Sequence, residues 1–187
     1  ESLWTFDAGL GISAPPITYQ LDGRQYIALL VGFGGGYSAL GGQPPADLGW
    51  SYRRQTRRLI AFSLDGAADL PAQPPPLVPQ PIEAPGFAVD EQLAADGADL
   101  FERKKAVGIC WYCHGMGVVS GGAAPDLRAS PVVLDEKTFE VIVRGGRLTG
   151  NGMPAFPDLS DGELESLRHY IRQQAEAGLP AKQAAAD

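Results

Sequence analysis

The chain has 187 residues, 15 basic and 22 acidic side chains, a net charge of −7 and a mean hydropathy of −0.09. This length holds one domain or two small ones. The acidic balance argues against nucleic acid as a partner and suits a basic or dipolar redox protein. No apolar run approaches the length of a membrane-spanning helix, so the composition is that of a soluble globular protein.

Residues 1–70 show the pattern of β-structure. Apolar or β-rich runs predict strands over 3–6, 12–21, 24–33 and 59–64. Asp22-Gly23 lies between the second and third runs and predicts a two-residue hairpin turn, while Pro15-Pro16 weakens the start of the second run. The long Gly- and Pro-rich stretch that follows Phe33 has no periodicity, which is typical of a functional or interface loop.

This predicted sheet has no second layer in its own sequence. One sheet of about four strands leaves apolar faces in water unless something packs on them. Four strands in meander order also make one blade of a β-propeller, in which adjacent blades supply the missing cover. The alternative is a small independent β domain.

A proline-rich stretch then divides the chain. Residues 71–87 carry seven prolines and are too rich in proline for a helix or a sheet. They predict an extended, semi-rigid spacer of polyproline type. We therefore place the domain boundary here, with domains at 1–70 and 88–187.

Residues 88–187 show helical periodicity. Asp90 is the expected N-cap of a first helix that runs towards Lys105. A second helix is expected from Asp135 to Arg144, ended by Gly145-Gly146. Ser160 and Glu163 form a capping box that opens a last helix, with Leu164, Leu167, Tyr170 and Ile171 on its buried face, and the tail from Gly178 is expected to fray.

The chemistry of this chain centres on Cys110-Trp111-Tyr112-Cys113-His114. Two cysteines three positions apart with a histidine directly after the second are typical of covalent c-type haem attachment, in which the histidine reaches the iron. A disulfide, a redox dithiol and part of a zinc site are the alternatives. A disulfide across this spacing is strained, and zinc would need more ligands than the remaining cysteine and histidine content offers.

A second axial ligand can come from few side chains, because only Met116, Met153 and His169 remain. Met116 is too close in sequence to His114 to reach the opposite face of a haem. His169 falls in a helical stretch, where a packing role is the simpler interpretation. Met153 lies in an irregular Gly- and Pro-containing loop that can carry its sulfur to iron, with core filling as the alternative.

Residues 88–178 resemble class I cytochrome c in the order of helix, Cys-x-x-Cys-His, proline loop, helix, methionine loop and terminal helix. In this resemblance Pro125 matches the proline whose carbonyl orients the haem-ligating histidine, which fits the need for a fixed imidazole. Arg128 looks like the basic residue that pairs with a haem propionate. An ordinary surface cation is the other interpretation of Arg128.

Residues 1–70 resemble the last blade of the PQQ-dependent alcohol dehydrogenases, in the stretches 3–6, 11–19, 22–28 and 59–64. Trp4 looks like a tryptophan by which blades dock in that family. A propeller, a proline-rich linker and a haem domain in this order are the layout of the quinohaemoprotein alcohol dehydrogenases. The resemblance implies a blade of an eight-bladed propeller followed by an all-α class I cytochrome c domain.

The chain departs from that family because about seven blades are missing. The resemblance implies that the catalytic aspartate, the Ca²⁺ ligands and most of the PQQ pocket lie in those blades, so no catalytic residue is expected in this chain. The Gly34-Gly35-Gly36 loop aligns with a Gly-rich turn near the quinone, where Gly lets the backbone approach a planar ring. Gly35 and Gly36 are thus implied PQQ contacts, with a plain tight turn as the alternative.

These patterns leave two alternative functions for the chain. In the first, the chain is the C-terminal part of a periplasmic quinohaemoprotein alcohol dehydrogenase, and its haem passes electrons from reduced PQQ to a small copper protein, a cytochrome or a quinone. The remaining blades then come from the same gene or a partner chain. In the second, the chain is a stand-alone periplasmic electron-transfer cytochrome c with a β appendage for docking.

Overall fold

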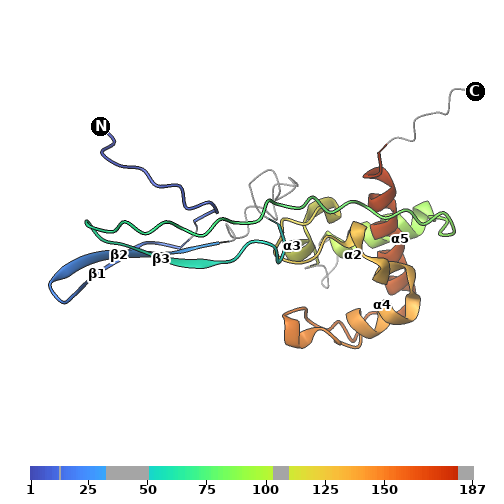
Figure 1. Cartoon of the computed structure of the whole chain (residues 1–187). Helices are drawn as coiled ribbons and strands as arrows, with labels where there is room; N and C mark the ends of the chain where they lie inside the picture. The colour runs from blue at the N-terminus through green and yellow to red at the C-terminus, as the bar shows by residue number, and fades with distance from the viewer. Residues whose placement is uncertain (13, 33–50, 103–109, 181–187) are drawn as a thin grey trace, which may run out of the picture.

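A computed structural model of the chain describes residues 1–12, 14–32, 51–102 and 110–180. A small sheet lies at one end of the molecule and a group of helices at the other, and the proline-rich segment runs between them along the length of the molecule (Figure 1). Within the described residues, no helix is both long and apolar enough to cross a membrane.

The sheet has three antiparallel strands in the order β1-β2-β3: β1 (Ile17–Leu21), β2 (Arg24–Val31) and β3 (Arg58–Phe62). The predicted turn between the first two is confirmed, since Asp22 and Gly23 both have positive φ, at 51° and 76°. Such a pair matches the right-handed twist of the strands that it joins.

Two strand predictions need correction. Residues 3–6 are not a strand, because their backbone pairs with no neighbouring strand in the described part of the chain; Trp4 and Phe6 instead contact the ring of Phe62 at centroid distances of 5.4 and 5.1 Å. The strand predicted over 12–21 begins only at Ile17. The two prolines before Ile17 have no N–H to donate to a strand ladder, which explains the later start.

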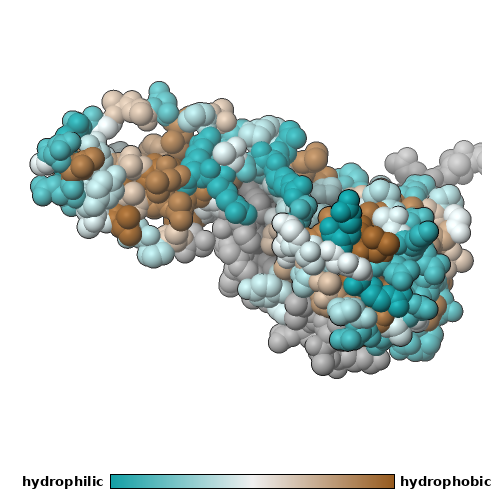
Figure 2. All heavy atoms as spheres, turned by 90° about the horizontal axis from the view of Figure 1, so that it is seen from below, coloured by the Kyte–Doolittle hydropathy of each residue, from teal (hydrophilic) through white to brown (hydrophobic). Residues whose placement is uncertain are grey.

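The sheet leaves much of its apolar surface open. Ala8 is buried in a small cluster with Val31 and Ile60 of the sheet. The exposed fractions of Ile17, Leu30 and Leu59 are 62%, 60% and 69%, and Figure 2 shows apolar residues gathered over the sheet end of the molecule. An exposed apolar surface of this kind marks a site of interaction.

The helical part is built from α2 (Glu91–Phe101), α3 (Cys110–His114), α4 (Glu136–Val143) and α5 (Asp161–Ala177). Short 3-10 turns lie between them, at η2 (Met116–Val118), η3 (Leu127–Ala129), η4 (Pro131–Leu134) and η5 (Thr149–Asn151). Asp90 is the N-cap of α2, as predicted, and Asp135, the expected start of the second helix, is the N-cap of α4; both accept from backbone N–H groups. The Ser160–Glu163 capping box opens α5, as predicted.

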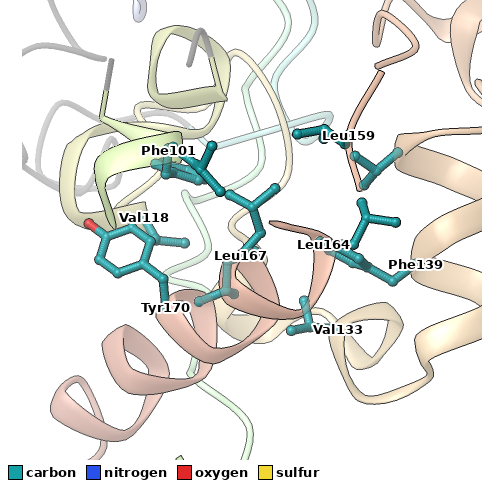
Figure 3. Packing of buried hydrophobic residues seen from close by; sticks show 11 residues of the cluster. Phe101, Val118, Val133, Phe139, Leu159, Leu164, Leu167 and Tyr170 are labelled. Carbon is teal, nitrogen blue, oxygen red and sulfur yellow. The ribbon is translucent and has the colours of Figure 1, made fainter. Parts of the chain in front are cut away.

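These helices enclose one apolar cluster to which α5 contributes most. Leu164, Leu167, Tyr170 and Ile171 are all at most 5% exposed, as the periodicity predicts. In Figure 3, Leu167 and Tyr170 point towards Phe101 and Val118, and Leu164 lies beside Phe139. The cluster therefore joins α2, α4 and α5 to the turn that follows α3.

Candidate haem site

Helix α3 carries both cysteines and His114. Residues at positions i, i+3 and i+4 of an α-helix lie on one face, so this spacing directs the two thiols and the imidazole to the same side. Both cysteines are free thiols in this structure. One helical turn thus presents three groups to a single ligand.

The environment of Cys110 bears on the alternatives to haem. Burial raises the pKa of the Cys110 thiol to about 11, so the thiol stays protonated at neutral pH. Cysteines of redox dithiols work the other way, because their environment lowers the pKa to favour the thiolate. The described residues also contain no group of three or more His, Cys, Asp or Glu side chains placed to hold a metal ion.

His114 is 8% exposed, and its Nδ1 lies 2.8 Å from the carbonyl oxygen of Pro125. A carbonyl can only accept, so Nδ1 carries the proton and the lone pair is on Nε2. Burial lowers the pKa of His114, because the imidazolium is disfavoured away from water. His114 is thus held as a neutral imidazole in the tautomer that can bind a metal through Nε2.

The loop after Pro125 is fixed by an ion pair between Asp126 and Arg128. The Asp126 carboxylate accepts from the Arg128 backbone N–H at 3.1 Å, from Nε at 3.0 Å and from Nη2 at 2.7 Å. The side chains are 4% and 15% exposed. The guanidinium therefore has a partner within the chain, and pairing of Arg128 with a haem propionate stays a prediction.

Met153 lies in the loop that follows α4, as expected, and is partly buried. The loop is ordered by short-range bonds: Gly152 has φ +92°, and the Met153 N–H donates to the carbonyl of Leu148 at 3.3 Å. The Phe156 N–H donates to the carbonyl of Val143 at the end of α4. Met153 packs against the same apolar cluster as Cys110, so the loop brings a thioether to the core that borders the haem motif.

The structure gives His169 a packing role. Its Nδ1 accepts from the backbone N–H of Asp90 at 2.9 Å, and its Nε2 lies 3.2 Å from a Glu165 carboxylate oxygen. The ring also packs on Phe87 at a centroid distance of 4.9 Å. Both ring nitrogens are engaged, so His169 serves the helix packing. Gly35 and Gly36, the implied PQQ contacts, lie outside the described residues.

Two features of the site were missed by the sequence analysis. The Glu102 carboxylate accepts from the Gly117 N–H at 2.7 Å and from the Tyr170 hydroxyl at 2.9 Å, which ties α2, η2 and α5 together. Gly115, directly after the histidine, has φ +82°, and a Cβ there would lie 1.8 Å from the carbonyl oxygen of Val119. A glycine after Cys-x-x-Cys-His was the only sequence signal for this tight turn.

Replacing Gly115 with alanine is expected to destabilise the protein strongly. The left-handed backbone costs about 1–2 kcal/mol for a residue with a Cβ, and the clash with Val119 adds to this cost. The matched control is Gly117→Ala, where φ is +60° but the closest atom, on Gln174, is 3.8 Å from the new Cβ. Urea unfolding checks both: equal losses for the two variants would contradict the clash.

The residues present fit a c-type haem. Two thiols and a neutral imidazole share one face of α3, and a thioether packs on the same cluster. The helices, the Cys-x-x-Cys-His turn and the methionine loop together define the helical part as a cytochrome c domain. Residues 92–171 match the family described as cytochrome c oxidase, cbb3-type, subunit III.

Comparisons with known proteins extend the relationship to the rest of the chain. It is 41% identical over 175 residues to quinohemoprotein alcohol dehydrogenase ADH IIB of Pseudomonas putida, covering 91% of this chain and 24% of that protein. It is 35% identical over 180 residues to the dehydrogenase subunit of alcohol dehydrogenase (quinone) of Gluconobacter oxydans, covering 94% and 22%.

Solved structures show the same relationship as the sequence comparisons. Quinohemoprotein alcohol dehydrogenase ADHIIG from Pseudomonas putida HK5 superposes with a TM-score of 0.69 at 32% identity, over 90% of this chain and 23% of that one. The Comamonas testosteroni enzyme gives 0.63 at 30% identity, over 92% and 23%. The chain is thus related to the quinohaemoprotein alcohol dehydrogenases, and the predicted resemblance to their C-terminal region is confirmed. It spans about a quarter of the length of the curated relatives it matches.

Proposed function

We propose that this chain is the C-terminal, electron-transferring part of a PQQ-dependent quinohaemoprotein alcohol dehydrogenase. Its c-type haem accepts electrons from reduced PQQ and passes them to an external acceptor. The observation that carries the proposal is the placement of both thiols and His114 on one face of α3, with His114 Nδ1 held by the Pro125 carbonyl. The relationship to alcohol dehydrogenases over nearly the whole chain supports it.

The residues of the site have distinct roles in this proposal. Cys110 and Cys113 would hold the haem covalently through thioether bonds, and His114 Nε2 and the Met153 sulfur would bind its iron. When bound, haem supplies one-electron redox chemistry. Ligation of the iron by both Met153 and His114 would raise the potential and leave no position for oxygen, which suits electron transfer.

Second-sphere residues set the orientation of these ligands. The Pro125 carbonyl fixes the imidazole plane and, by accepting from Nδ1, makes Nε2 the better donor. Arg128 is proposed to lie near a propionate while staying bonded to Asp126, since a guanidinium has five N–H donors and Asp126 uses two of them.

Residues 1–70 are proposed to complete the last blade of a propeller, residues 71–87 to form the linker and residues 88–187 the cytochrome c domain. The exposed apolar residues of the sheet support this, because Ile17, Leu30 and Leu59 would be covered by adjacent blades. The fourth strand of that blade is not among the strands of the described residues, so a neighbouring segment would have to pair with the sheet edge.

The remaining parts of the reaction belong to the rest of the enzyme. PQQ and Ca²⁺, which acts as a Lewis acid, would be bound mostly outside this chain, with Gly35 and Gly36 as proposed backbone contacts to PQQ. A periplasmic location is inferred because covalent c-type haem is associated with exported proteins. A small copper protein, a cytochrome or a quinone would be the acceptor.

Haem reduction by alcohol tests this proposal. In the full-length enzyme loaded with PQQ, adding a primary alcohol under anaerobic conditions is expected to convert the haem spectrum to the reduced form. The same enzyme without PQQ, and this chain by itself, are expected to stay oxidised. Reduction of the isolated chain by alcohol, or no reduction in the loaded enzyme, would contradict the proposal.

A further inference from the structure

The proline-rich linker is bonded to the sheet end of the molecule by arginine side chains. Arg54 Nε donates to the carbonyl of Pro75 at 2.5 Å, and Arg58 Nη2 donates to the carbonyl of Pro71. Prolines cannot pair as a strand because they have no N–H, yet their carbonyls remain good acceptors. The multiple N–H groups of arginine suit this need.

Amide side chains continue the same pattern. Gln55 Nε2 donates to the Pro74 carbonyl at 3.0 Å. Gln73 bonds both backbone groups of Thr56: its Oε1 accepts from the N–H at 3.1 Å, and its Nε2 donates to the carbonyl at 2.8 Å. Residues 71–75 therefore lie antiparallel to residues 54–58, in a ladder made of side chains.

The other end of the linker is bonded to the helical domain. Arg172 of α5 is 1% exposed, and its Nη1 donates to the Ile82 carbonyl at 2.9 Å. The Ile82 N–H in turn donates to the carbonyl of Arg128 at 3.0 Å. Ile82 thus has both backbone groups satisfied by the domain that carries the haem motif.

Two further contacts of α5 hold the end of the linker. The Arg168 guanidinium lies 5.4 Å from the centre of the Phe87 ring, and its Nε donates to the Val133 carbonyl at 2.9 Å. His169 accepts from the Asp90 N–H, just past the linker. Arg168, His169 and Arg172 form a buried polar face of α5, which the linker covers together with η4 and Asp90.

The bridge between the two bonded ends is short. The Leu77 N–H donates to Ser51 Oγ at 2.9 Å, so only residues 78–81 lie between the bonded ends. Pro79 and Pro81 fix φ near −65° at two of these four positions. Figure 1 shows the linker running extended from the sheet, across α5, to the far side of the helical part. An extended chain anchored at both ends and stiffened in between transmits position rather than allowing free motion.

We propose that residues 71–87 act as a rigid strap that fixes the haem domain relative to the sheet, with Arg54 and Arg58 as its latches at the sheet end and Arg172 as its latch at the helical end. This inference rests on the proposed function, since the geometry it fixes is that between the quinone and the haem. The three arginines are positioning residues and do not contact the reacting groups. The latch at Arg172 matters most, because a hydrogen bond from a buried charged group is worth more than one at an exposed site.

Amide hydrogen exchange tests the strap without a measurement of enzyme activity. In the haem-loaded protein, the Ile82 amide, bonded to Arg128, and the Leu77 amide, bonded to Ser51 Oγ at 2.9 Å, are expected to be protected. Arg172→Met should speed exchange at Ile82 by about tenfold to a hundredfold, as expected for loss of one charge-assisted bond. Arg54→Met with Arg58→Met should do the same at Leu77.

Stopped-flow reduction of the haem in the PQQ-loaded full-length enzyme tests the positioning role. Arg172→Met is expected to slow haem reduction by about tenfold, because small misplacements of reacting groups cost this much or more. The haem midpoint potential should not change. The double variant Pro79→Gly with Pro81→Gly touches neither latch and should slow reduction in the same way, which keeps the test valid if Arg172→Met folds poorly.

The control is Arg53→Met, since Arg53 lies in the same segment but its guanidinium sits 5.2 Å from the Tyr52 ring. It should leave exchange and haem reduction at wild-type values. Unchanged exchange in the latch variants would overturn the strap, and faster exchange with unchanged haem reduction would overturn its positioning role. A wild-type haem that alcohol does not reduce would contradict the proposed function instead, and exchange would still decide on the strap.

Discussion

Replacing Met153 with leucine is expected to remove the sulfur-to-iron absorption band and to lower the haem midpoint potential. Met/His ligation favours the reduced haem, and axial ligands together span roughly 0.8 V of potential. The midpoint potential should fall by a large fraction of the difference between haems with Met/His ligation and haems with a weaker sixth ligand. Leucine conserves the volume, so stability should change by less than about 1.5 kcal/mol. Redox titration followed by visible absorption measures both effects.

Met116 provides the matched control for this experiment. It is the other methionine of the chain, lies in η2 two residues after His114, and is 45% exposed. Met116→Leu should keep the band and the potential. A Met153→Leu protein with an unchanged band and potential would show that Met153 fills the core and that another group takes the sixth position.

Gly97→Ala is expected to cause the largest loss of stability at a position away from the haem motif. A Cβ at Gly97 of α2 would lie 2.0 Å from the Ser166 carbonyl oxygen and 2.8 Å from Tyr170 Cβ on α5. Both neighbours belong to a helix that cannot yield locally, so α2 and α5 must separate. Overpacking of this kind costs about 1–3 kcal/mol and occasionally more.

Gly162→Ala is the control for the helix-propensity gain that alanine brings. Gly162 lies in the first turn of α5, and a Cβ there meets nothing within 4 Å. This variant should gain up to about 1 kcal/mol. Equilibrium unfolding in urea compares the two. If Gly97→Ala were as stable as the wild type, the close crossing of α2 and α5 would be wrong.

Features that depend on neighbours in sequence could be predicted. Asp90, Asp135 and Ser160 mark where the three helices start in the structure. A capping side chain accepts from N–H groups within the next three residues that have no partner inside the helix, so the choice is local. The Asp22-Gly23 turn is another local choice. The Cys-x-x-Cys-His motif belongs here too, since its spacing acts within one helical turn.

Features that depend on distant partners could not. The stretch 3–6 has the composition of a strand, but a strand exists only where a neighbour accepts its hydrogen bonds. Nothing in the local sequence marks Arg172 of α5 as buried, yet it is 1% exposed because the segment around Ile82, 90 positions earlier, lies over it. The sequence leaves Arg128 either beside a propionate or on the surface as an ordinary cation, and it does not show the ion pair of Arg128 with Asp126.

Cys110 and Cys113 are proposed to hold a haem covalently on the face of α3 that His114 shares, and intact mass under denaturing conditions tests this attachment. For protein purified from its natural host, we expect the polypeptide to keep the mass of one haem, located by digestion to the peptide with both cysteines. A polypeptide that loses all haem on denaturation, or that carries a disulfide between these cysteines, would contradict the claim.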